Sequence, residues 1–281
     1  MSLTYGEAMG RAREILDRAG SPSAALDAQL LLAHAAGLDR AGALARLRDC
    51  AAGGTIHIFE DLIRRRAARE PVAYLTGEKE FYSLAFAVDR RALIPRPETE
   101  TLVEAALSLL PADHSARVAE LGAGSGAVAV ALAVNRPGWS LDAGDISADA
   151  LVLARHNAAR HGVSGRVTFH HSSLFARMPD GPYHAVVSNP PYVPGGAPVD
   201  PEAALYEPSL ALYAGDDGLE VIRRIVADTP ARLSSGGWLL MEMGDGQAGA
   251  VLGLFDGGPW AETRLFNDLA GTARVVAARR A

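Results

Sequence analysis

An Asn-Pro-Pro-Tyr motif, residues 189–192, directly follows an apolar run, residues 185–187, that is typical of a buried strand. Two successive prolines lack backbone N–H groups and fix φ, so the chain leaves the strand as a stiff loop. The side-chain carbonyl of Asn189 and the backbone carbonyl of Pro190 then form two acceptors that suit one NH2 group, and the Tyr192 ring could stack on the plane that carries it. The motif predicts a site for an amino group or, in the simpler interpretation, only a turn.

A glycine-rich motif, Val-Ala-Glu-Leu-Gly-Ala-Gly-Ser-Gly, occupies residues 118–126. It reads as a strand that runs into a turn and opens a helix, an arrangement in which backbone N–H groups approach a nucleotide closely. Asp145 follows about 20 residues later, the spacing of a ribose-binding carboxylate. Glu120 would repel a pyrophosphate but suits the cationic amino-acid portion of S-adenosylmethionine. The alternatives are a purely structural turn and, for Asp145, the capping of a helix.

The two motifs belong at one edge of a parallel sheet, since both follow strands and such sheets bind ligands at the carboxyl ends of their strands. A nucleoside site beside a pair of carbonyl acceptors looks like an amino-group methyltransferase that uses S-adenosylmethionine. The acceptors would orient the nitrogen and bind it more strongly as it becomes positive in the transition state. No strong general base is required in the motif, because the product can lose its proton to water.

Strands and helices alternate from residue 117 onward, which predicts a doubly wound, mostly parallel sheet within an α/β fold. Together with the two motifs, this pattern resembles the Rossmann-like fold of class I methyltransferases. The expected strands are residues 118–121, 141–144, 167–171, 185–188 and 238–243. The tail differs, because residues 264–266 and 274–277 have the pattern of an antiparallel hairpin added at the sheet edge.

Residues 1–75 predict a small all-helical domain, which begins with a capping box at Thr4 and Glu7. Helices are expected over about residues 5–19, 22–36, 39–47 and 56–69. The three consecutive arginines at Arg64 to Arg66 predict a solvent-exposed helix face. We expect a helical substrate-recognition domain at 1–75, a hairpin linker at 76–96 and a methyltransferase domain at 97–281.

The composition argues against several classes of protein, namely disulfide-bonded, zinc-binding, nucleic-acid-binding and membrane-spanning proteins. Cys50 is the only cysteine, which excludes an internal disulfide and a zinc site with several cysteines, and no metal is expected. The net charge of −6 makes direct nucleic-acid binding unlikely. The longest purely apolar stretch, residues 128–134, is far too short for a membrane span. Because the N-terminus also lacks the pattern of a signal peptide, we expect a cytoplasmic protein with no membrane association.

Five segments resemble the HemK/PrmC family in order and spacing. They are Ala-Tyr-Leu-Thr-Gly at 73–77, Leu-Ile-Pro-Arg-Pro-Glu-Thr-Glu at 93–100, Glu-Leu-Gly-Ala-Gly-Ser-Gly at 120–126, Asn-Pro-Pro-Tyr at 189–192 and Glu-Pro at 207–208. Members of this family are glutamine methyltransferases that modify the Gly-Gly-Gln motif of peptide-chain release factors. The resemblance extends over nearly the whole chain and implies translation termination as the process served.

The resemblance also implies roles by position. The residues implied to bind S-adenosylmethionine are Glu120, Gly122, Ala123, Gly124, Ser125, Gly126, Asp145, Ser173, Leu174 and Asn189. Those implied to bind the substrate glutamine are Asn189, Pro190, Pro191 and Tyr192, of which Asn189, Pro190 and Tyr192 are the catalytic set. Ser173 departs from the pattern, since many relatives have an acidic residue there, although Leu174 and Phe175 can still wall the adenine pocket. The helical domain would grip the release factor.

Two other functions fit parts of the sequence. An amino-group methyltransferase acting on rRNA or DNA bases would use the same Asn-Pro-Pro-Tyr motif, and an NAD-binding oxidoreductase would use the glycine turn but leave that motif unexplained. Two charged residues also have open roles. Arg96, between two prolines, could face a carboxylate ligand, and Glu207 could orient the site or belong to a surface loop.

Overall fold

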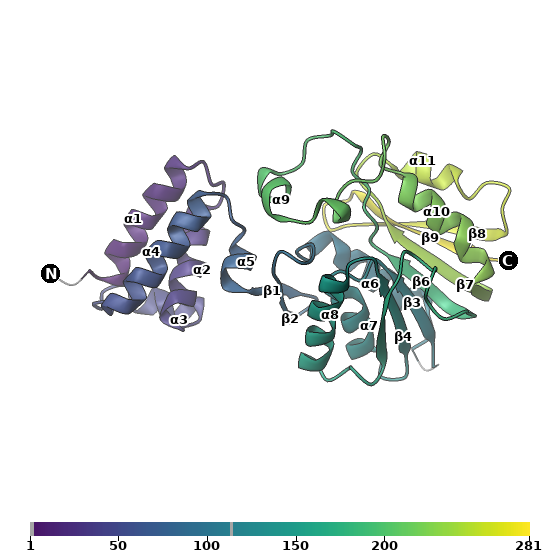
Figure 1. Cartoon of the computed structure of the whole chain (residues 1–281), viewed down its shortest axis with the longest axis horizontal. Coiled ribbons are helices and arrows are strands. Elements are labelled where there is room, and N and C mark those ends of the chain that lie inside the picture. Colours follow the sequence, from purple (N-terminus) through teal and green to yellow (C-terminus); the bar gives the residue numbers. More distant parts are fainter. Residues whose placement is uncertain (1–2, 113–114) are drawn as a thin grey trace. The chain divides into compact units, whose positions relative to one another are not determined.

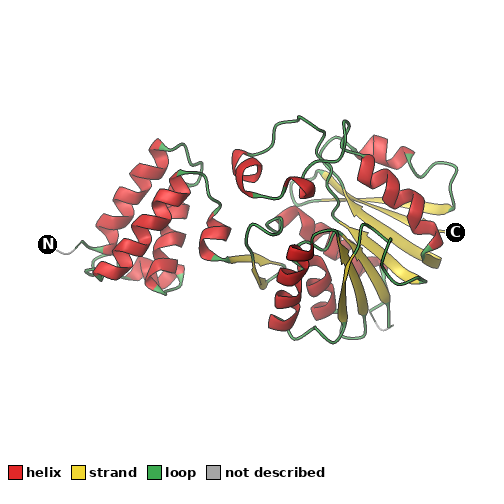
Figure 2. Cartoon of the chain, viewed as in Figure 1, coloured by secondary structure: helices red, strands yellow, loops and turns green. Residues whose placement is uncertain are grey.

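The structure, a computed structural model, describes residues 3–112 and 115–281 and divides the chain into two compact units (Figure 1). The first unit comprises the chain up to Glu78 together with Val199–Tyr206, and the second comprises Lys79–Pro198 and Glu207–Ala281. The first unit is helical and the second is built on a sheet (Figure 2). The inclusion of residues 199–206 in the helical unit has no counterpart in the sequence analysis.

The helical unit packs its helices around an apolar core. Its helices are α1 (Tyr5–Arg18), α2 (Ala24–Ala36), α3 (Arg40–Ala45), α4 (Gly53–Ala67) and α5 (Val72–Thr76), with α9 (Pro201–Tyr206) from the later segment. Leu16, Leu31 and Phe59 lie in the core, at most 1% exposed. The pattern predicts the first four helices, whereas α5, a single short turn after Pro71, has too few residues to show a period.

The ends of these helices follow local chemistry. Thr4 and Glu7 form the predicted capping box at the start of α1, with each side chain bonded to the other residue's backbone N–H. Gly37 ends α2 with a φ of 64°, in the left-handed region that glycine adopts without strain. The ends of these helices are therefore determined by residues close to them in the sequence, which is why they could be predicted.

A buried ion pair joins the helices of this unit. Arg66 on α4 is 4% exposed, and its Nε donates to Asp27 Oδ2 on α2 at 2.8 Å. Its Nη2 pairs with Glu202 of α9 at 2.6 Å. The interpretation of Arg64 to Arg66 as a solvated face is therefore wrong for Arg66. A buried guanidinium needs carboxylate partners, and these come from segments distant in the sequence.

The second unit contains a seven-stranded sheet in the order β5-β4-β3-β6-β7-β9-β8. The strands are β3 (Arg117–Leu121), β4 (Ser140–Asp145), β5 (Val167–His171), β6 (Tyr183–Ser188), β7 (Leu233–Glu242), β8 (Trp260–Asn267) and β9 (Ala273–Arg280). The five strands from β5 to β7 run parallel, and β9 and β8 add antiparallel pairs. The predicted doubly wound fold with a terminal hairpin is confirmed.

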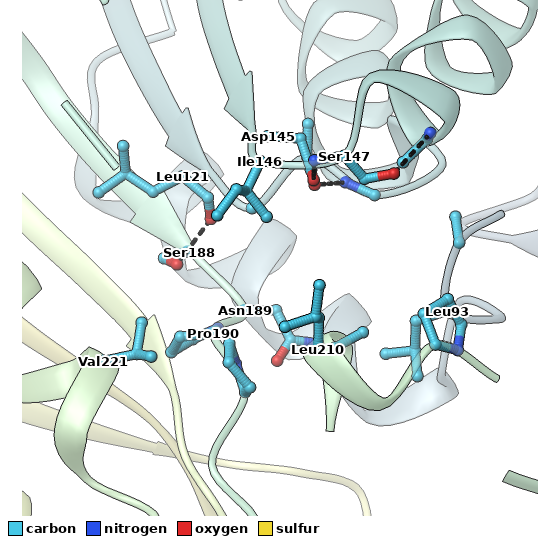
Figure 3. Close-up of a pocket in the computed structure, with 18 of the residues that line it drawn as sticks. Leu93, Leu121, Asp145, Ile146, Ser147, Ser188, Asn189, Pro190, Leu210 and Val221 are labelled. Carbon is cyan, nitrogen blue, oxygen red and sulfur yellow. Dashed lines mark hydrogen bonds between the residues drawn. The ribbon is translucent and has the colours of Figure 1, made fainter. Parts of the chain in front are cut away.

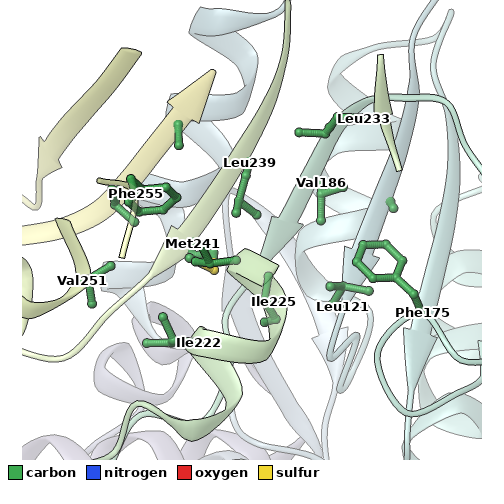
Figure 4. Close-up of a cluster of buried hydrophobic side chains, with 14 of the residues drawn as sticks. Leu121, Phe175, Val186, Ile222, Ile225, Leu233, Leu239, Met241, Val251 and Phe255 are labelled. Atoms are coloured by element: carbon green, nitrogen blue, oxygen red, sulfur yellow. The ribbon is translucent and has the colours of Figure 1, made fainter. Parts of the chain in front are cut away.

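Helices cover both faces of this sheet. The helices α6 (Glu100–Leu109), α7 (Ala127–Asn135) and α8 (Ala148–Arg160) pack side by side on one face. The other face carries α10 (Glu220–Asp228) and α11 (Ala248–Gly253), whose Ile222, Ile225 and Val251 meet Leu239 and Met241 of β7 in an apolar core (Figure 4). Burial on both faces explains why the central strands read as continuous apolar runs.

Smaller elements complete the unit. A two-stranded hairpin, β1 (Glu78–Phe81) and β2 (Leu84–Ala87), precedes the sheet, and short 3-10 turns lie at η1 (Pro97–Thr99), η2 (Ser209–Ala211) and η3 (Thr229–Ala231). Across the described residues no helix combines the length and apolar character needed to cross a membrane. The same residues contain no cluster of three or more His, Cys, Asp or Glu side chains placed to hold a metal ion.

Candidate active site

A cavity of about 420 Å³ opens at the carboxyl ends of β3, β4 and β6, where doubly wound sheets bind ligands. Of the residues implied by the sequence, Glu120, Gly122, Ala123, Gly124, Ser125, Asp145, Ser173, Leu174, Asn189, Pro190 and Pro191 line it. Gly126 and Tyr192 lie outside the lining. In Figure 3, Asp145 and Ile146 stand on one side of the space, and Asn189, Pro190 and Leu210 on the other. The two sequence motifs therefore share one pocket.

The glycine turn is tied to the neighbouring strand by its backbone. The N–H groups of Gly122 and Ala123 donate to the Gly144 carbonyl at 2.8 and 3.0 Å. Gly122 and Gly124 have φ values of 77° and 53°, in the region that favours glycine. A Cβ atom at Gly124 would meet no other atom within 4 Å, so open space lies against this backbone. A ligand can therefore approach the turn closely.

The backbone of Ser125 and Gly126 also packs the turn against α8, although Ser125 itself lines the cavity. The Ser125 carbonyl accepts from the side chain of Asn157 at 2.9 Å, and Asn157 is fully buried. Gly126 has a φ of 80°, and a Cβ atom there would lie 3.1 Å from the Cβ of Ala154. Close approach of helix and turn, rather than contact with the pocket, therefore requires glycine at 126.

The Asp145 carboxylate is fixed in the pocket wall by backbone bonds. Its Oδ2 accepts from Gly124 N at 2.7 Å and its Oδ1 from Ser147 N at 2.8 Å. Helix α8 is capped by Ser147, whose Oγ accepts from Ala150 N at 3.1 Å, so the cap does not depend on Asp145. Each Asp145 oxygen keeps a second lone pair, which a ribose hydroxyl can use.

Glu120 brings a buried carboxyl group to the lining, with 3% of the residue exposed. Burial raises the pKa of this group well above its usual value, and the charge of Asp145 raises it further. Its Oε2 accepts from Ala129 N at 3.0 Å. A cation beside a buried carboxylate offsets the cost of its desolvation, so this position fits the ammonium group of an amino-acid ligand.

The segment after β5 forms another wall. The Ser172 hydroxyl donates to the Leu174 carbonyl at 2.7 Å, and Leu174 adopts a φ of 48°. Ser173 and Leu174 line the cavity, whereas Phe175 lies 5% exposed in the core behind it. Ile146 adds an apolar surface, 57% exposed, that the sequence analysis did not predict. Leu174 and Ile146 thus give the cavity apolar surface beside the place expected for adenine.

The Asn-Pro-Pro-Tyr loop is held at both ends. The Ser188 hydroxyl donates to the Leu121 carbonyl at 2.7 Å, and Gln247 Nε2 donates to the Tyr192 carbonyl at 2.9 Å. Gly218, with a φ of 75°, lies so close to the loop that a Cβ atom there would be 2.2 Å from the Tyr192 carbonyl oxygen. The loop therefore has little freedom to move.

The Asn189 side chain is bonded on one side only. Its Nδ2 donates to Thr99 Oγ1 at 3.0 Å. Among the described residues, no donor bonds to Asn189 Oδ1 or to the carbonyl oxygen of Pro190. Both acceptors that the motif predicts are thus available to a ligand.

Tyr192 supports the loop from behind. Its ring packs against the core cluster, and its hydroxyl donates to Glu242 Oε1 at 3.3 Å. The sequence analysis placed Tyr192 over the substrate and gave no role to Glu242 or to Thr99. An acidic residue that ends the apolar run Leu239–Met241, at the same sheet edge as the motif, was the available signal for Glu242.

Arg96 and Glu207 form an ion pair beside the pocket. Arg96 Nη2 donates to Glu207 Oε1 at 2.6 Å, and Ile94 N donates to Glu207 Oε2 at 3.3 Å. Glu207 is 8% exposed, so its assignment to a surface loop is wrong. The pair clamps the Pro-Arg-Pro segment. Arg96 also lines the cavity, so its contact with a carboxylate ligand stays a prediction.

This fold and this site define a Rossmann-like methyltransferase. Residues 99–204 match the methyltransferase small domain family. A methyltransferase structure from Pyrococcus furiosus aligns with a TM-score of 0.53 at 14% identity, covering 78% of this chain and 96% of that chain. At this identity the likeness concerns the fold alone.

Sequence relatives identify the family. Residues 7–77 match the PrmC N-terminal domain family. A release factor glutamine methyltransferase of Deinococcus radiodurans is 44% identical over 269 residues, 95% of each chain. One from Coxiella burnetii is 45% identical over 222 residues, 78% of each chain. The chain therefore belongs to the release factor glutamine methyltransferase family.

Proposed function

We propose that this protein transfers a methyl group from S-adenosylmethionine to the side-chain amide nitrogen of the glutamine in the Gly-Gly-Gln motif of peptide-chain release factors. The names of its relatives support the substrate. The observation that carries the chemistry is the pair of available acceptors, Asn189 Oδ1 and the Pro190 carbonyl, in a rigid loop beside a nucleoside-type pocket.

The pocket lining fits the proposed methyl donor part by part. The open backbone at Gly122 and Gly124 and the buried carboxyl of Glu120 suit an amino-acid moiety with its ammonium group. Asp145 suits the ribose hydroxyls, because a fixed carboxylate accepts two hydroxyl bonds without reorganisation. Leu174 and Ile146 suit the adenine plane. When bound, S-adenosylmethionine supplies an electrophilic methyl group on a sulfonium.

The acceptor loop activates a poor nucleophile. An amide nitrogen has a delocalised lone pair, so it must be aligned with the methyl group before it can attack. As the C–N bond forms and the bond between the methyl carbon and the sulfur breaks, with its electron pair leaving on the sulfur, the nitrogen becomes more positive and its hydrogens more acidic. Carbonyl oxygens at Asn189 and Pro190 therefore bind the transition state more strongly than the ground state. The extra proton then leaves to water.

The helical unit is proposed to bind the release factor. It has its own apolar core, and its residues 7–77 match a domain family named after PrmC, which supports a role particular to this family. The methyltransferase unit has a separate core and contains every residue that lines the pocket. Recognition of a large protein substrate and methyl transfer are thus assigned to different units.

The test is to incubate the protein with methyl-labelled S-adenosylmethionine and, in parallel, with a release factor, ribosomal RNA and DNA. We expect label in the release factor only, on the glutamine of its Gly-Gly-Gln motif. A release factor whose motif glutamine is replaced by glutamate, which has no NH2 group, is the matched negative substrate. Label confined to nucleic acid would overturn the proposal and favour a base methyltransferase.

A further inference from the structure

A buried carboxyl group stands behind the acceptor loop. Glu242 at the end of β7 is 1% exposed, and its Oε1 accepts from the Tyr192 hydroxyl at 3.3 Å. Its Oε2 has no hydrogen-bond partner in the described part of the chain. Burial raises the pKa of Glu242 to about 7. An incompletely bonded carboxyl group is costly in a core, so a site that keeps one calls for an explanation.

Thr99 connects this carboxyl group to the loop. The Thr99 hydroxyl lies close enough to Glu242 to stabilise its ionised form and so lower its pKa, and Thr99 Oγ1 accepts from Asn189 Nδ2 at 3.0 Å. A hydroxyl has a single hydrogen to donate. If that hydrogen is turned to Glu242, the Thr99 oxygen can only accept from Asn189. The NH2 group of Asn189 is then held toward Thr99, and its carbonyl is directed elsewhere.

We propose that Glu242 is a positioning residue that acts through Thr99 and Tyr192 to fix the orientation of the Asn189 amide, so that Oδ1 is presented to the substrate NH2. This inference rests on the proposed function and adds to it a residue that does not touch the substrate. Without a group restricted to accepting, Thr99 could donate to Asn189 Oδ1 instead. The flipped amide would offer the substrate a donor where an acceptor is needed.

The charged surroundings of Glu242 are consistent with a role for its ionised form. Arg274 of β9 stabilises the negative charge, Glu98 of η1 opposes it, and the Tyr192 hydroxyl donates to it. Arg274 is itself held by Asp268, with its Nη2 at 3.1 Å from Oδ2. A protonated Glu242 could donate a hydrogen bond to Thr99. The Thr99 hydroxyl would then be free to donate to Asn189 Oδ1, and the orientation of the amide would no longer be fixed. Methyl transfer should therefore increase as the pH rises through about 7.

The test compares Glu242→Gln with the wild type, because glutamine keeps the shape but adds a donor that can reverse the Thr99 hydroxyl. We expect kcat to fall about 10-fold or more, while the KM for release factor and the affinity for S-adenosylmethionine stay within about 2-fold. The increase of kcat through pH 7 should disappear. Glu262→Gln on β8 makes the same chemical change at a residue ion-paired with Arg264, and it should leave all three quantities unchanged.

Substitutions at Thr99 separate positioning from packing. Thr99→Ser keeps the hydroxyl and should retain most of kcat, whereas Thr99→Val keeps the shape and should lose as much as Glu242→Gln. The double variant Glu242→Gln/Thr99→Val should lose no more kcat than either single variant, because both substitutions disrupt the same hydrogen-bond network. A wild-type kcat in Glu242→Gln, or equal losses in Thr99→Ser and Thr99→Val, would overturn the proposal.

The orientation of the amide can also be followed without turnover. With ¹⁵N-asparagine labelling, the side-chain NH2 signal of Asn189, identified by its loss in Asn189→Ala, should shift in Glu242→Gln and Thr99→Val but not in Glu262→Gln. An unshifted signal in Glu242→Gln would overturn the positioning role. If the wild type failed to methylate any release factor, the proposed function would fail, and this signal would still decide the role of Glu242.

Discussion

Replacing Glu242 by glutamine should stabilise the protein at alkaline pH while it impairs catalysis. Burial raises the pKa of Glu242 from 4.5 to about 7 in the folded protein. Between these two values the folded state binds a proton that the unfolded state releases. The free energy of unfolding contributed by Glu242 is therefore highest below pH 4.5, falls as the pH rises toward 7, and stays low above it.

The size of the effect follows from the shift. The pKa rises by about 2.5 units, and at about 1.4 kcal/mol per unit the full cost of ionisation is about 3 kcal/mol. Glutamine is neutral at every pH, and its carbonyl can still accept from the Tyr192 hydroxyl. Glu242→Gln should therefore be more stable than the wild type by about 3 kcal/mol at pH 8, but by only about 1 kcal/mol at pH 5.

Urea unfolding followed by tryptophan fluorescence measures this difference. All three tryptophans, Trp139, Trp238 and Trp260, lie in the sheet unit, so the signal does not mix the two units. Glu262→Gln, at a side chain 34% exposed, should change stability by no more than about 0.5 kcal/mol at either pH. A gain for Glu242→Gln that is equal at pH 5 and pH 8 would refute the assignment of the raised pKa to this residue.

Four further changes test the site. Asp145→Ala should weaken S-adenosylmethionine binding by about 2 kcal/mol or more in calorimetry, and unchanged affinity would limit Asp145 to its backbone bonds. Asn189→Asp should lower the methylation rate about 100-fold with cofactor binding retained, and near-normal turnover would remove Asn189 from catalysis. Gly218→Ala places a Cβ atom 2.2 Å from the Tyr192 carbonyl oxygen and should slow turnover at least 10-fold, and unchanged turnover would show that the loop need not be held in this position. Deleting residues 1–75 should abolish methylation of intact release factor, and activity undiminished by the deletion would contradict its role in recognition.

Local chemistry made much of the fold predictable. Thr4 and Gly37 set helix ends through bonds and backbone angles that involve only their near neighbours. The central strands were recognisable because burial on both faces leaves continuous apolar runs, as in residues 185–187. Arg66 was not predictable, since its burial depends on Asp27 and Glu202, which are close to it only after folding.

The same division applies to the site. Asp145 and Asn189 each follow a strand directly, so their place at the pocket edge could be predicted from position alone. The contacts of Tyr192 could not, because whether its ring faces the pocket or the core depends on how the loop is anchored by Gly218 and Gln247. A sequence pattern shows which strand end a residue occupies but not which way its side chain turns.

The orientation of one amide explains why the site keeps a costly carboxyl group. A hydroxyl such as that of Thr99 can donate or accept, so by itself it gives no preference between the two orientations of the Asn189 amide. A preference arises only from a group that is restricted to accepting, and an ionised Glu242 is such a group. A bias of about 1.4 kcal/mol already makes the productive orientation tenfold more populated. The protein therefore accepts a loss of about 3 kcal/mol in stability at Glu242 and gains an acceptor that is correctly oriented before the substrate arrives.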